Sequence, residues 1–348
     1  MKRPTIADIA RRAGVSKGAV SYALNGRPGV SQLTRARIMA VADEMGWTPN
    51  SAARALSAAR AEAVGMVVAR PARIVGLEPF FMQLISGIEG ELAKRSVALV
   101  LQLVNDIEAE AEVHRRWWGQ RRIDGVIVVD LRVDDVRVRV LEELNLPAVV
   151  IGGPQGLGTL VGVWSDDAAA VRSVVEYLVA LGHRRIARVT GLPELRHTAI
   201  RTEAYLAAVR ELRVHGEVRV ADYTGEEGAR ATRALLSGRQ RPTAILYDND
   251  VMAVAGVAVA QEMGLSVPGD VSLVAWDDSS LCQLVHPPLT ALSRDIPEYG
   301  AHAAQRLLQL IDGEPVSTFQ DTTAQLVPRG STGIPFGGEP EAGRSTGP

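Results

Sequence analysis

The chain has 348 residues, of which 47% are hydrophobic, and a formal net charge of −2 at pH 7. This length is too great for one ordinary domain, so we expect two or three. The single cysteine, Cys282, excludes an internal disulfide and is typical of a reducing cytosol. The sequence contains no recognisable signal peptide and no run of about 18 apolar residues. We therefore expect a cytoplasmic protein without a membrane span.

The charge is distributed unevenly along the chain. Residues 1–60 carry ten Lys and Arg against three acidic residues, a net charge of +7, which leaves −9 for the remainder. A basic segment on an acidic body indicates that the segment meets a polyanion. The alternative is a basic face that is merely solvated.

The basic segment contains three short amphipathic helix patterns. The first runs from a cap at Thr5 to Gly14, the second follows a cap at Ser16, and the third runs from Ser31 to Gly46. Apolar residues recur at helical spacing in each pattern: Ile6, Ile9, Ala10 and Ala13; Ala19, Val20, Ala23 and Leu24; Ile38, Val41, Ala42 and Met45. A tight glycine turn between the first two helices predicts a helix-turn-helix.

The outer face of the second helix distinguishes a reading head from a generic three-helix bundle. This face presents Lys17, Gly18, Ser21, Tyr22 and Asn25. Hydroxyls, amides and helix N-termini suit phosphate oxygens, whereas Lys17 and Tyr22 can reach base edges in the major groove. The sequence therefore predicts a face that reads duplex DNA.

A short alanine-rich pattern, "TPNSAARALSAAR", follows the head. Asn50 or Ser51 can cap it, and it carries Arg54 and Leu56. A lone helix of about eight residues is marginal in water and should order only against a partner. An exposed leucine on such a helix can enter the minor groove and kink the duplex. The alternative is an ordinary linker helix with one exposed leucine.

From Val64 onward, apolar runs alternate with helical patterns. The runs are "VGMVVA", "VALVLQLV", "GVIVV", "PAVVIG", "RIARVT", "TAILY" and "VSLVAW". Strands separated by helices predict parallel sheets with covered faces, and the body is long enough for two such lobes. Ligands of open α/β sheets bind at the carboxyl ends of strands. The residues at those places are Phe80, Phe81, Asp130, Gly152, the segment around Arg201, Tyr223, Asp248, Asn249, Asp250, Asp277 and Asp278.

The run from Thr5 through Leu56 resembles the DNA-binding head and hinge helix of the lac repressor (LacI/GalR) family of transcriptional regulators. The matching pattern is "IADIARRAGVS...VSYALNG...VS..TR.RI...A...GW.PN..AR.L". The resemblance implies that Lys17, Gly18 and Tyr22 read bases. It implies that Leu56 and Arg54 enter the minor groove. The positions that it assigns to phosphate contacts are Thr5, Ser16, Ser21, Asn25, Ser31 and Asn50.

The body resembles the effector core of the same family, which is itself related to periplasmic sugar-binding proteins. Matching landmarks include "EPFFMQLISGIEGEL", "IDGVIVV", "RTEAY", "YDNDVMA" and "GLSVPGDVSLVAWDDS". The resemblance implies an amino lobe of about residues 61–162 and 291–320. It implies a carboxyl lobe of about residues 163–290 and 321–330.

The resemblance also implies an effector site between the lobes. The matching positions are Phe80, Phe81, Asp130, Arg201, Tyr223, Asn249 and Asp277. Arg201 matches the arginine that anchors effectors. Carboxylates and amides bind hydroxyls bidentately while aromatic faces cover an apolar side, so we expect a sugar-like effector. Judged individually, Phe80 and Phe81 are equally consistent with core residues. For Asp250 a helix N-cap is favoured over a ligand contact, and for Asp278 a structural role is favoured.

Two further segments bear on assembly and order. Residues 251–260, "VMAVAGVAVA", are apolar on every face of a helix, which predicts burial against a second subunit. A dimer also suits two reading heads on a palindromic operator. "LVPRGS" fits the closing strand of the family, and the Gly- and Pro-rich residues 331–348 are expected to be disordered.

An enzyme and a transport-type sugar-binding protein are the competing classes. "GGPQGLG" lacks the order of a dinucleotide or phosphate loop, and no G-x-S-x-G elbow occurs. No histidine accompanies the acidic pairs Asp166-Asp167 and Asp277-Asp278 at ligand spacing. His183 in "LGHRRIA" is interpreted as structural. We therefore predict no catalytic residue, metal or cofactor. A transport protein would need a secretion signal and would have no use for the basic head.

The predicted organisation is a small all-α helix-turn-helix domain at residues 1–48, a hinge helix at 49–60, and an α/β two-lobed core with parallel sheets at 61–330. We expect a homodimeric repressor that binds a double-stranded DNA operator and is released by a sugar-like effector. Regulation by a purine-like corepressor remains the alternative, because whether a ligand weakens or strengthens DNA binding depends on which state of the protein it prefers.

Overall fold

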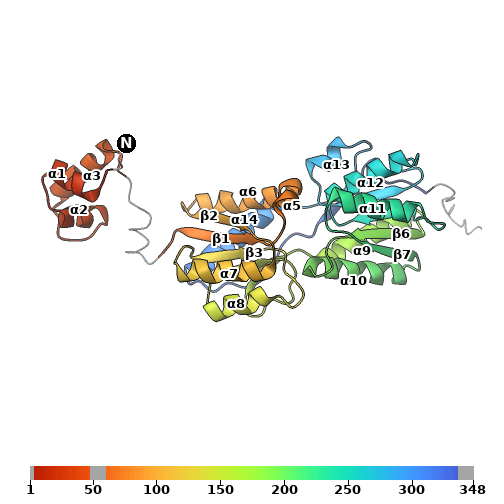
Figure 1. The fold of residues 1–348 in the computed structure, drawn as a ribbon, viewed down its shortest axis with the longest axis horizontal. Coiled ribbons are helices and arrows are strands. Elements are labelled where there is room, and N and C mark those ends of the chain that lie inside the picture. The colour runs from red at the N-terminus through yellow and green to blue at the C-terminus, as the bar shows by residue number, and fades with distance from the viewer. Residues whose placement is uncertain (1–3, 48–59, 336–348) are drawn as a thin grey trace, which may run out of the picture. The chain divides into compact units, whose positions relative to one another are not determined.

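The computed structural model describes residues 4–47 and 60–335. The chain divides into two compact units between Ala61 and Glu62, and Figure 1 labels their helices and strands. The predicted hinge segment, with Asn50, Arg54 and Leu56, lies outside the described residues.

The first unit contains three helices, α1 (Ile6–Ala13), α2 (Lys17–Leu24) and α3 (Gln32–Glu44). The Thr5 hydroxyl accepts a hydrogen bond from the Asp8 N–H, and the Asp8 carboxylate accepts one from the Thr5 N–H. Gly14 ends α1 in the left-handed conformation. Ser16 and Ser31 cap α2 and α3. The predicted caps are therefore confirmed.

The core of the first unit consists of the apolar residues that the helical spacing predicts to point inward. Ile9, Val20 and Ile38, one from each helix, are fully buried and pack in one cluster. Because these side chains meet at the centre, the opposite face of α2 is left for other contacts.

The amino lobe of the second unit is a parallel sheet covered on both faces (Figure 1). Its strand order is β11-β5-β4-β3-β1-β2. The strands are β1 (Ala63–Val68), β2 (Ala98–Leu103), β3 (Gly125–Val128), β4 (Ala148–Ile151), β5 (Val161–Trp164) and β11 (Phe319–Gln320). The short α5 (Ala72–Leu77) precedes α6 (Pro79–Ala93), which packs with α14 (Ile296–Ile311) over one face. Helices α7 (Ile107–Gly119) and α8 (Val136–Leu144) cover the other.

The carboxyl lobe repeats this arrangement with the strand order β12-β10-β9-β8-β6-β7. The strands are β6 (Arg185–Thr190), β7 (His215–Val220), β8 (Ala244–Tyr247), β9 (Ser272–Trp276), β10 (Thr290–Ser293) and β12 (Gln325–Val327). All neighbouring strands are parallel except β10 and β12. Helices α9 (Asp167–Ala180) and α10 (Arg196–Glu211) cover one face, and α11 (Gly225–Leu236) and α12 (Asp250–Glu262) cover the other. The short α13 (Ser280–Leu284) packs beside α12.

The chain passes between the lobes after β5, after β10 and after β11. Two of the predicted lobe boundaries, those after about residues 162 and 290, lie a few residues too early. Every residue of β5 pairs within the amino-lobe sheet, with β4 or β11, and every residue of β10 pairs within the carboxyl-lobe sheet, with β9 or β12. The apolar pattern does not reveal these limits, because strand pairing alone decides which sheet a crossover residue joins.

Residues 331–335 belong to the folded carboxyl lobe, so the prediction of disorder from residue 331 is wrong for this segment. The buried Ser331 hydroxyl donates to the Leu273 carbonyl at 2.6 Å, and the Gly333 carbonyl lies 3.1 Å from Nε2 of His183. Small polar residues can join a sheet edge through their backbone, which composition alone does not reveal. The same contact confirms the structural role of His183, while residues 336–348 lie outside the described part.

Candidate functional site

The outer face of α2 carries the side chains that the sequence predicts to meet DNA. Lys17, Gly18 and Asn25 are exposed, Tyr22 is 46% exposed, and Ser21 is half-buried. This face takes no part in the apolar cluster of the head. It therefore offers an ammonium group, a phenol and amide donors in one place.

The loop after α2 is fixed by an arginine from α3. Arg35 donates from Nη1 to the Ala23 carbonyl at 2.8 Å and from Nη2 to the Arg27 carbonyl at 2.7 Å. Asn25 also donates to the Ser21 carbonyl at 2.9 Å. These bonds hold the end of α2 and its loop against α3, so the outer face is presented by a rigid support.

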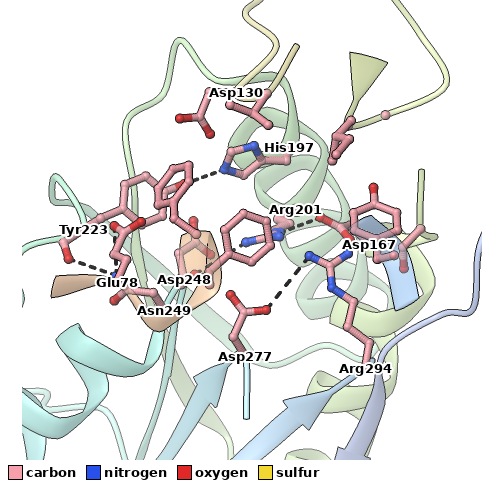
Figure 2. A pocket seen from close by; sticks show the side chains of 18 of the residues that line it. Glu78, Asp130, Asp167, His197, Arg201, Tyr223, Asp248, Asn249, Asp277 and Arg294 are labelled. Carbon is pink, nitrogen blue, oxygen red and sulfur yellow. Dashed lines mark hydrogen bonds and ion pairs between the residues drawn. The ribbon is translucent and has the colours of Figure 1, made fainter. Parts of the chain in front are cut away.

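In the second unit, a cavity is lined by residues of both lobes (Figure 2). The seven residues that the sequence assigns to effector contacts all line it: Phe80, Phe81, Asp130, Arg201, Tyr223, Asn249 and Asp277. They come together because the carboxyl ends of parallel strands in both sheets face this cavity.

Three of the lining residues adopt backbone conformations that L-residues rarely populate. Asp130, Tyr223 and Asp277 have φ values of 53°, 71° and 64°, soon after the ends of β3, β7 and β9. Each such conformation costs on the order of 1–3 kcal/mol and persists only where surrounding contacts enforce it. Strain of this kind clusters at ligand sites, and here it turns three side chains at strand ends into one cavity.

Arg201 on α10 is held from two sides. Its Nε donates to Oδ2 of Asp167 at 2.7 Å, and its guanidinium carbon lies 3.6 Å from the ring centroid of Trp276. Burial opposes its charge, but the nearby acidic groups, chiefly Asp167 and Asp248, together raise the pKa of Arg201 above its ordinary value. A planar cation with its orientation fixed in this way can hold a ligand oxygen.

The Tyr223 hydroxyl contacts α10. Its Oη lies 2.7 Å from Nε2 of His197 and 2.7 Å from Oγ1 of Thr198. Burial, with the charge of Arg201 beside it, lowers the pKa of His197 to about 4, so the imidazole is neutral at pH 7. His197 was not among the site residues predicted from the sequence, although it precedes Arg201 by four residues and therefore shares its helix face.

Arg70, Glu78 and Asp130 form a charged group at the amino-lobe wall. Arg70 donates from Nε to Asp130 at 2.6 Å, while its Nη1 lies 3.6 Å from Glu78. Burial favours protonation of Asp130, but the charge of Arg70 prevails and lowers the pKa of that carboxyl. Burial raises the pKa of Glu78 to about 8. Glu78, which the sequence analysis missed, is therefore protonated and neutral at pH 7.

Asn249 joins the lobes and caps α12. Its Oδ1 accepts from the Met252 N–H at 2.9 Å, and its Nδ2 donates to the Tyr223 carbonyl at 2.9 Å and approaches Glu78 at 3.4 Å. The interpretation of Asp250 as the N-cap is wrong, because Asn249 takes that position. Asp250 lines the cavity instead, and burial raises its pKa to about 6.

Asp277 and Arg294, which both line the cavity, form an ion pair that is too long for a hydrogen bond (Figure 2). Their nearest charged atoms are 4.0 Å apart, and Oδ1 of Asp277 and Nε of Arg294 have no hydrogen-bond partner among the described residues. Burial raises the pKa of Asp277. Arg294 follows β10 between the rings of Phe80 and Tyr299, and the sequence analysis missed it. The pair offers one acceptor and one donor to a hydroxylated ligand.

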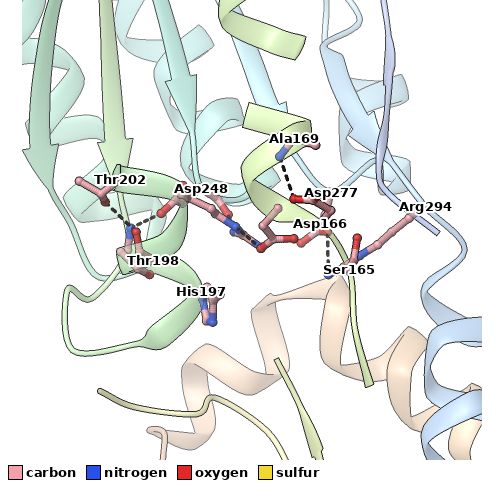
Figure 3. Close-up of polar contacts among 12 residues, drawn as sticks. Ser165, Asp166, Ala169, His197, Thr198, Thr202, Asp248, Asp277 and Arg294 are labelled. Atoms are coloured by element: carbon pink, nitrogen blue, oxygen red, sulfur yellow. Dashed lines mark hydrogen bonds and ion pairs between the residues drawn. The ribbon is translucent and has the colours of Figure 1, made fainter. Parts of the chain in front are cut away.

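Other acidic residues near the cavity have structural partners. Asp248 accepts two bonds from buried Arg188, at 2.6 and 2.8 Å, and one from the Gly191 N–H at 2.9 Å. Asp166 caps α9 by accepting from the Ala169 N–H at 2.9 Å (Figure 3). Asp278 forms an ion pair with Arg329 at 2.7 Å, as its predicted structural role requires.

Neither metal ligation nor a membrane span is indicated by the described residues. Within residues 4–47 and 60–335, no group of three or more His, Cys, Asp or Glu is arranged to hold a metal ion. In the same part of the chain, no helix has the length and hydropathy of a transmembrane segment.

A helix-turn-helix head attached to a two-lobed core with a polar, aromatic-lined cavity defines the class of ligand-regulated DNA-binding proteins.

Comparison with known proteins places the chain within this class. Residues 5–50 match the bacterial regulatory proteins of the lacI family, and residues 175–332 match the periplasmic binding protein-like domain. The chain is 31% identical over 322 residues to the HTH-type transcriptional regulator CelR of Thermobifida fusca, covering 90% of this chain and 93% of CelR. It is 30% identical over 337 residues to the repressor CytR of Escherichia coli K12, covering 94% and 96%. The chain belongs to the lacI family of bacterial regulatory proteins.

Solved structures of relatives resemble this chain over most of its length. The lac repressor dimer bound to operator and the anti-inducer ONPF has a TM-score of 0.85 at 27% identity, covering 95% of this chain and 100% of that one. The CelR–cellobiose complex has a TM-score of 0.72 at 28% identity, covering 94% and 100%. The predicted family and fold class are confirmed, and the protein is a DNA-binding transcription regulator with an effector-binding core.

Proposed function

We propose that the protein is a homodimeric repressor that binds a palindromic operator and is released from it by a neutral, sugar-like effector. The observation that carries the proposal is the cavity between the lobes, where aromatic faces accompany groups that bind hydroxyls. A regulator with a ligand cavity needs two states of different DNA affinity, and the effector selects between them by binding one better.

The reading surface is assigned to α2. Lys17, Gly18 and Tyr22 contact base edges, because they lie on the exposed face of the second helix of the helix-turn-helix. Phosphate contacts are assigned to Thr5, Ser16, Ser21, Asn25, Ser31 and Asn50. Minor-groove contacts are assigned to Arg54 and Leu56. The lac repressor dimer, a relative, has been solved bound to its operator, which supports operator binding by this chain.

The charges around the cavity favour a neutral effector. Asp130 is paired with Arg70, and Arg201 with Asp167. Asp277 and Arg294 then present an acceptor and a donor that have no hydrogen bond to each other. An anionic ligand group would meet the Asp277 carboxylate, and a cationic one would meet Arg294. A hydroxyl can donate to the first and accept from the second, as a sugar would.

Aromatic side chains provide the other property of a sugar site. Phe80 is half-buried, and Phe81 and Tyr223 are almost fully buried at the cavity wall. Their rings can cover the apolar C–H face of a pyranose while the polar groups bind its edge. The complex of the relative CelR with cellobiose supports a saccharide as the effector.

A dimer interface is assigned to α12. The lobe itself buries one side of this helix, but Val251, Val254 and Ala255 remain half-buried and Ala258 is exposed. These residues have the i, i+3, i+4, i+7 spacing of one apolar stripe. A second subunit related by a two-fold axis would cover the stripe and place two reading heads on an inverted repeat.

No catalytic step is assigned to the cavity. The carboxylates of Asp167 and Asp248 are held by arginines, and His197 is hydrogen-bonded to Tyr223. Pairs that are fixed in this way can orient a bound ligand.

The test begins with selection of binding sites from a random duplex library, followed by gel shifts with a panel of neutral mono- and disaccharides that includes cellobiose. We expect an inverted-repeat consensus and at least one sugar that releases it. Tyr22→Ala should weaken operator binding and leave sugar binding intact, whereas Arg201→Ala should do the reverse. Equal loss of both activities in either variant would contradict the division of labour between the two units.

A further inference from the structure

A buried ion cluster lies beneath the loop that follows β3. At its centre is Arg137, in the first turn of α8 and 2% exposed. Its Nε donates to Asp135 at 3.0 Å, and its Nη1 donates to Glu110 at 2.7 Å and to the Val129 carbonyl at 3.0 Å. Its Nη2 donates to Asp135 at 2.6 Å and to the Asp130 carbonyl at 2.9 Å. These contacts use all five N–H donors of the guanidinium.

Two of these bonds fix the backbone at the point where a cavity residue leaves the sheet. The carbonyls of Val129 and Asp130 are both acceptors of Arg137, and Asp130 has a φ of 53°. A left-handed non-glycine residue needs contacts that enforce its conformation. Holding the carbonyls on either side of this residue enforces it and directs the Asp130 carboxylate toward the cavity and Arg70.

The same cluster supports a connection between the lobes. Besides accepting from Arg137, Asp135 accepts from the Arg132 N–H at 2.8 Å. Arg132 forms an antiparallel bridge with Leu195 of the carboxyl lobe. On either side of it, the Val133 N–H donates to the carbonyl of residue 194 at 2.9 Å, and the Arg196 N–H donates to that of residue 131 at 2.7 Å. The bridge leads directly into α10, which carries His197 and Arg201.

We propose that Arg137 is a positioning residue for effector binding, which it serves without lining the cavity. It holds the loop of residues 129–135 in the one conformation that presents Asp130 to the effector and pairs with the start of α10. This inference rests on the proposed function, since it concerns the same effector site. Lysine cannot replace the arginine, because a single ammonium group cannot reach two carbonyls and two carboxylates in a planar fork.

A cluster that served stability alone would have different consequences. If Arg137 served stability alone, removing it from the buried ion pairs would lower the stability of the whole lobe, and no single segment would be affected more than the rest. A positioning residue instead fixes the loop and the bridge, so its loss should loosen residues 129–135 and 194–196 more than the rest of the lobe. The two roles are separated by measurements on those segments.

The first experiment is hydrogen exchange on the full-length protein without ligand, comparing wild type with Arg137→Lys. We expect exchange at residues 131–133 and 194–196 to accelerate about tenfold, the effect of losing one hydrogen bond with a charged partner. Glu110→Gln retains an acceptor oxygen for Nη1 and should exchange like wild type. Ile123→Val removes one methyl group from a buried side chain just before the start of β3, whereas the loop follows the end of that strand. This variant should also leave both segments protected.

Unchanged protection of both segments in Arg137→Lys would overturn the proposal. If that variant does not fold, Asp135→Asn provides a second test, because it weakens the acceptor of the Arg132 N–H. We then expect faster exchange at residues 131–133. Wild-type protection there would equally overturn the proposal.

The second experiment titrates the operator complex with the sugar identified in the panel. For Arg137→Lys we expect the sugar concentration for half-release to rise about tenfold, while operator affinity without sugar stays within about twofold of wild type. Ile123→Val should change neither quantity. A parallel fall in operator affinity would show general damage and overturn positioning. If the wild type responds to no sugar, the proposed function is wrong, while the exchange experiment still decides the role of Arg137 in the loop.

Discussion

Gly191 makes room for the ring of Tyr223, and replacing it with alanine should remove that ring from its place in the cavity. A Cβ atom at Gly191 would lie 1.8 Å from Cζ, 2.0 Å from Cε2 and 2.3 Å from Oη of Tyr223. Distances this short cannot be relieved by a small shift. The ring would have to move away from His197 and Thr198, to which its hydroxyl is bonded at 2.7 Å in each case.

The cost of this change follows from the contacts. Losing the two hydrogen bonds of Oη costs about 1 kcal/mol each. Inserting a methyl group into a filled core costs about 1–3 kcal/mol more. We therefore expect Gly191→Ala to lower the free energy of unfolding of the core by about 3–5 kcal/mol, measured by urea denaturation followed by tryptophan fluorescence.

A matched control makes the same covalent change where there is space. A Cβ at Gly90, on the exposed side of α6, would meet nothing within 4 Å. Gly90→Ala should therefore raise stability by about 0.5–1 kcal/mol, because alanine favours a helix. The decisive comparison repeats Gly191→Ala in a Tyr223→Ala background, where we expect its cost to fall below about 1 kcal/mol. An equal cost with and without the ring would refute the steric argument.

Three further substitutions test other parts of the account. Gly87→Ala would place a Cβ 1.8 Å from the Pro297 carbonyl oxygen, separating α6 from α14, and should lower the unfolding free energy by more than about 2 kcal/mol in the same assay. Burial lowers the pKa of His114 to about 4, so the unfolded chain binds the extra proton and wild type loses stability as pH falls from about 6.5 to 4. His114→Leu should reduce that loss between urea midpoints at pH 7 and pH 5. Burial raises the pKa of Glu78 to about 8, so the folded state keeps the proton and wild type loses stability as pH rises from about 4.5 to 8. Glu78→Gln should remove the loss of stability that Glu78 causes over this pH range. If the unfolding free energy of the variant fell with pH as steeply as that of wild type, the buried neutral carboxyl would be contradicted.

The elements that the sequence predicts correctly depend on local interactions. Thr5, Asp8 and Gly14 define the first helix through contacts within three or four residues, and these appear directly in the sequence. The inner strands β1, β3, β4, β8 and β9 are buried along their whole length, so they are visible as continuous apolar runs. The effector residues after β3, β7 and β9 follow from the rule that ligands bind at the carboxyl ends of parallel strands.

The site residues that the sequence did not reveal depend on distant partners. Arg294 lines the cavity because a crossover after β10 brings it opposite Asp277, 17 positions earlier in the chain. Asp167 is defined by its ion pair with Arg201, and Glu78 by burial beside Arg70. In none of these pairs do the two residues lie in the same helical turn or the same strand, so local sequence patterns do not reveal them. His197 is different, since its spacing from Arg201 was a usable signal.

The central claim is that one chain couples DNA reading to effector binding, and linkage gives its most direct test. Operator affinity is measured by fluorescence anisotropy with and without saturating sugar, and sugar affinity by calorimetry with and without saturating operator. Because coupling is reciprocal, we expect the sugar to weaken operator binding and the operator to weaken sugar binding by the same factor, about tenfold or more. Two affinities that do not depend on each other would contradict the account.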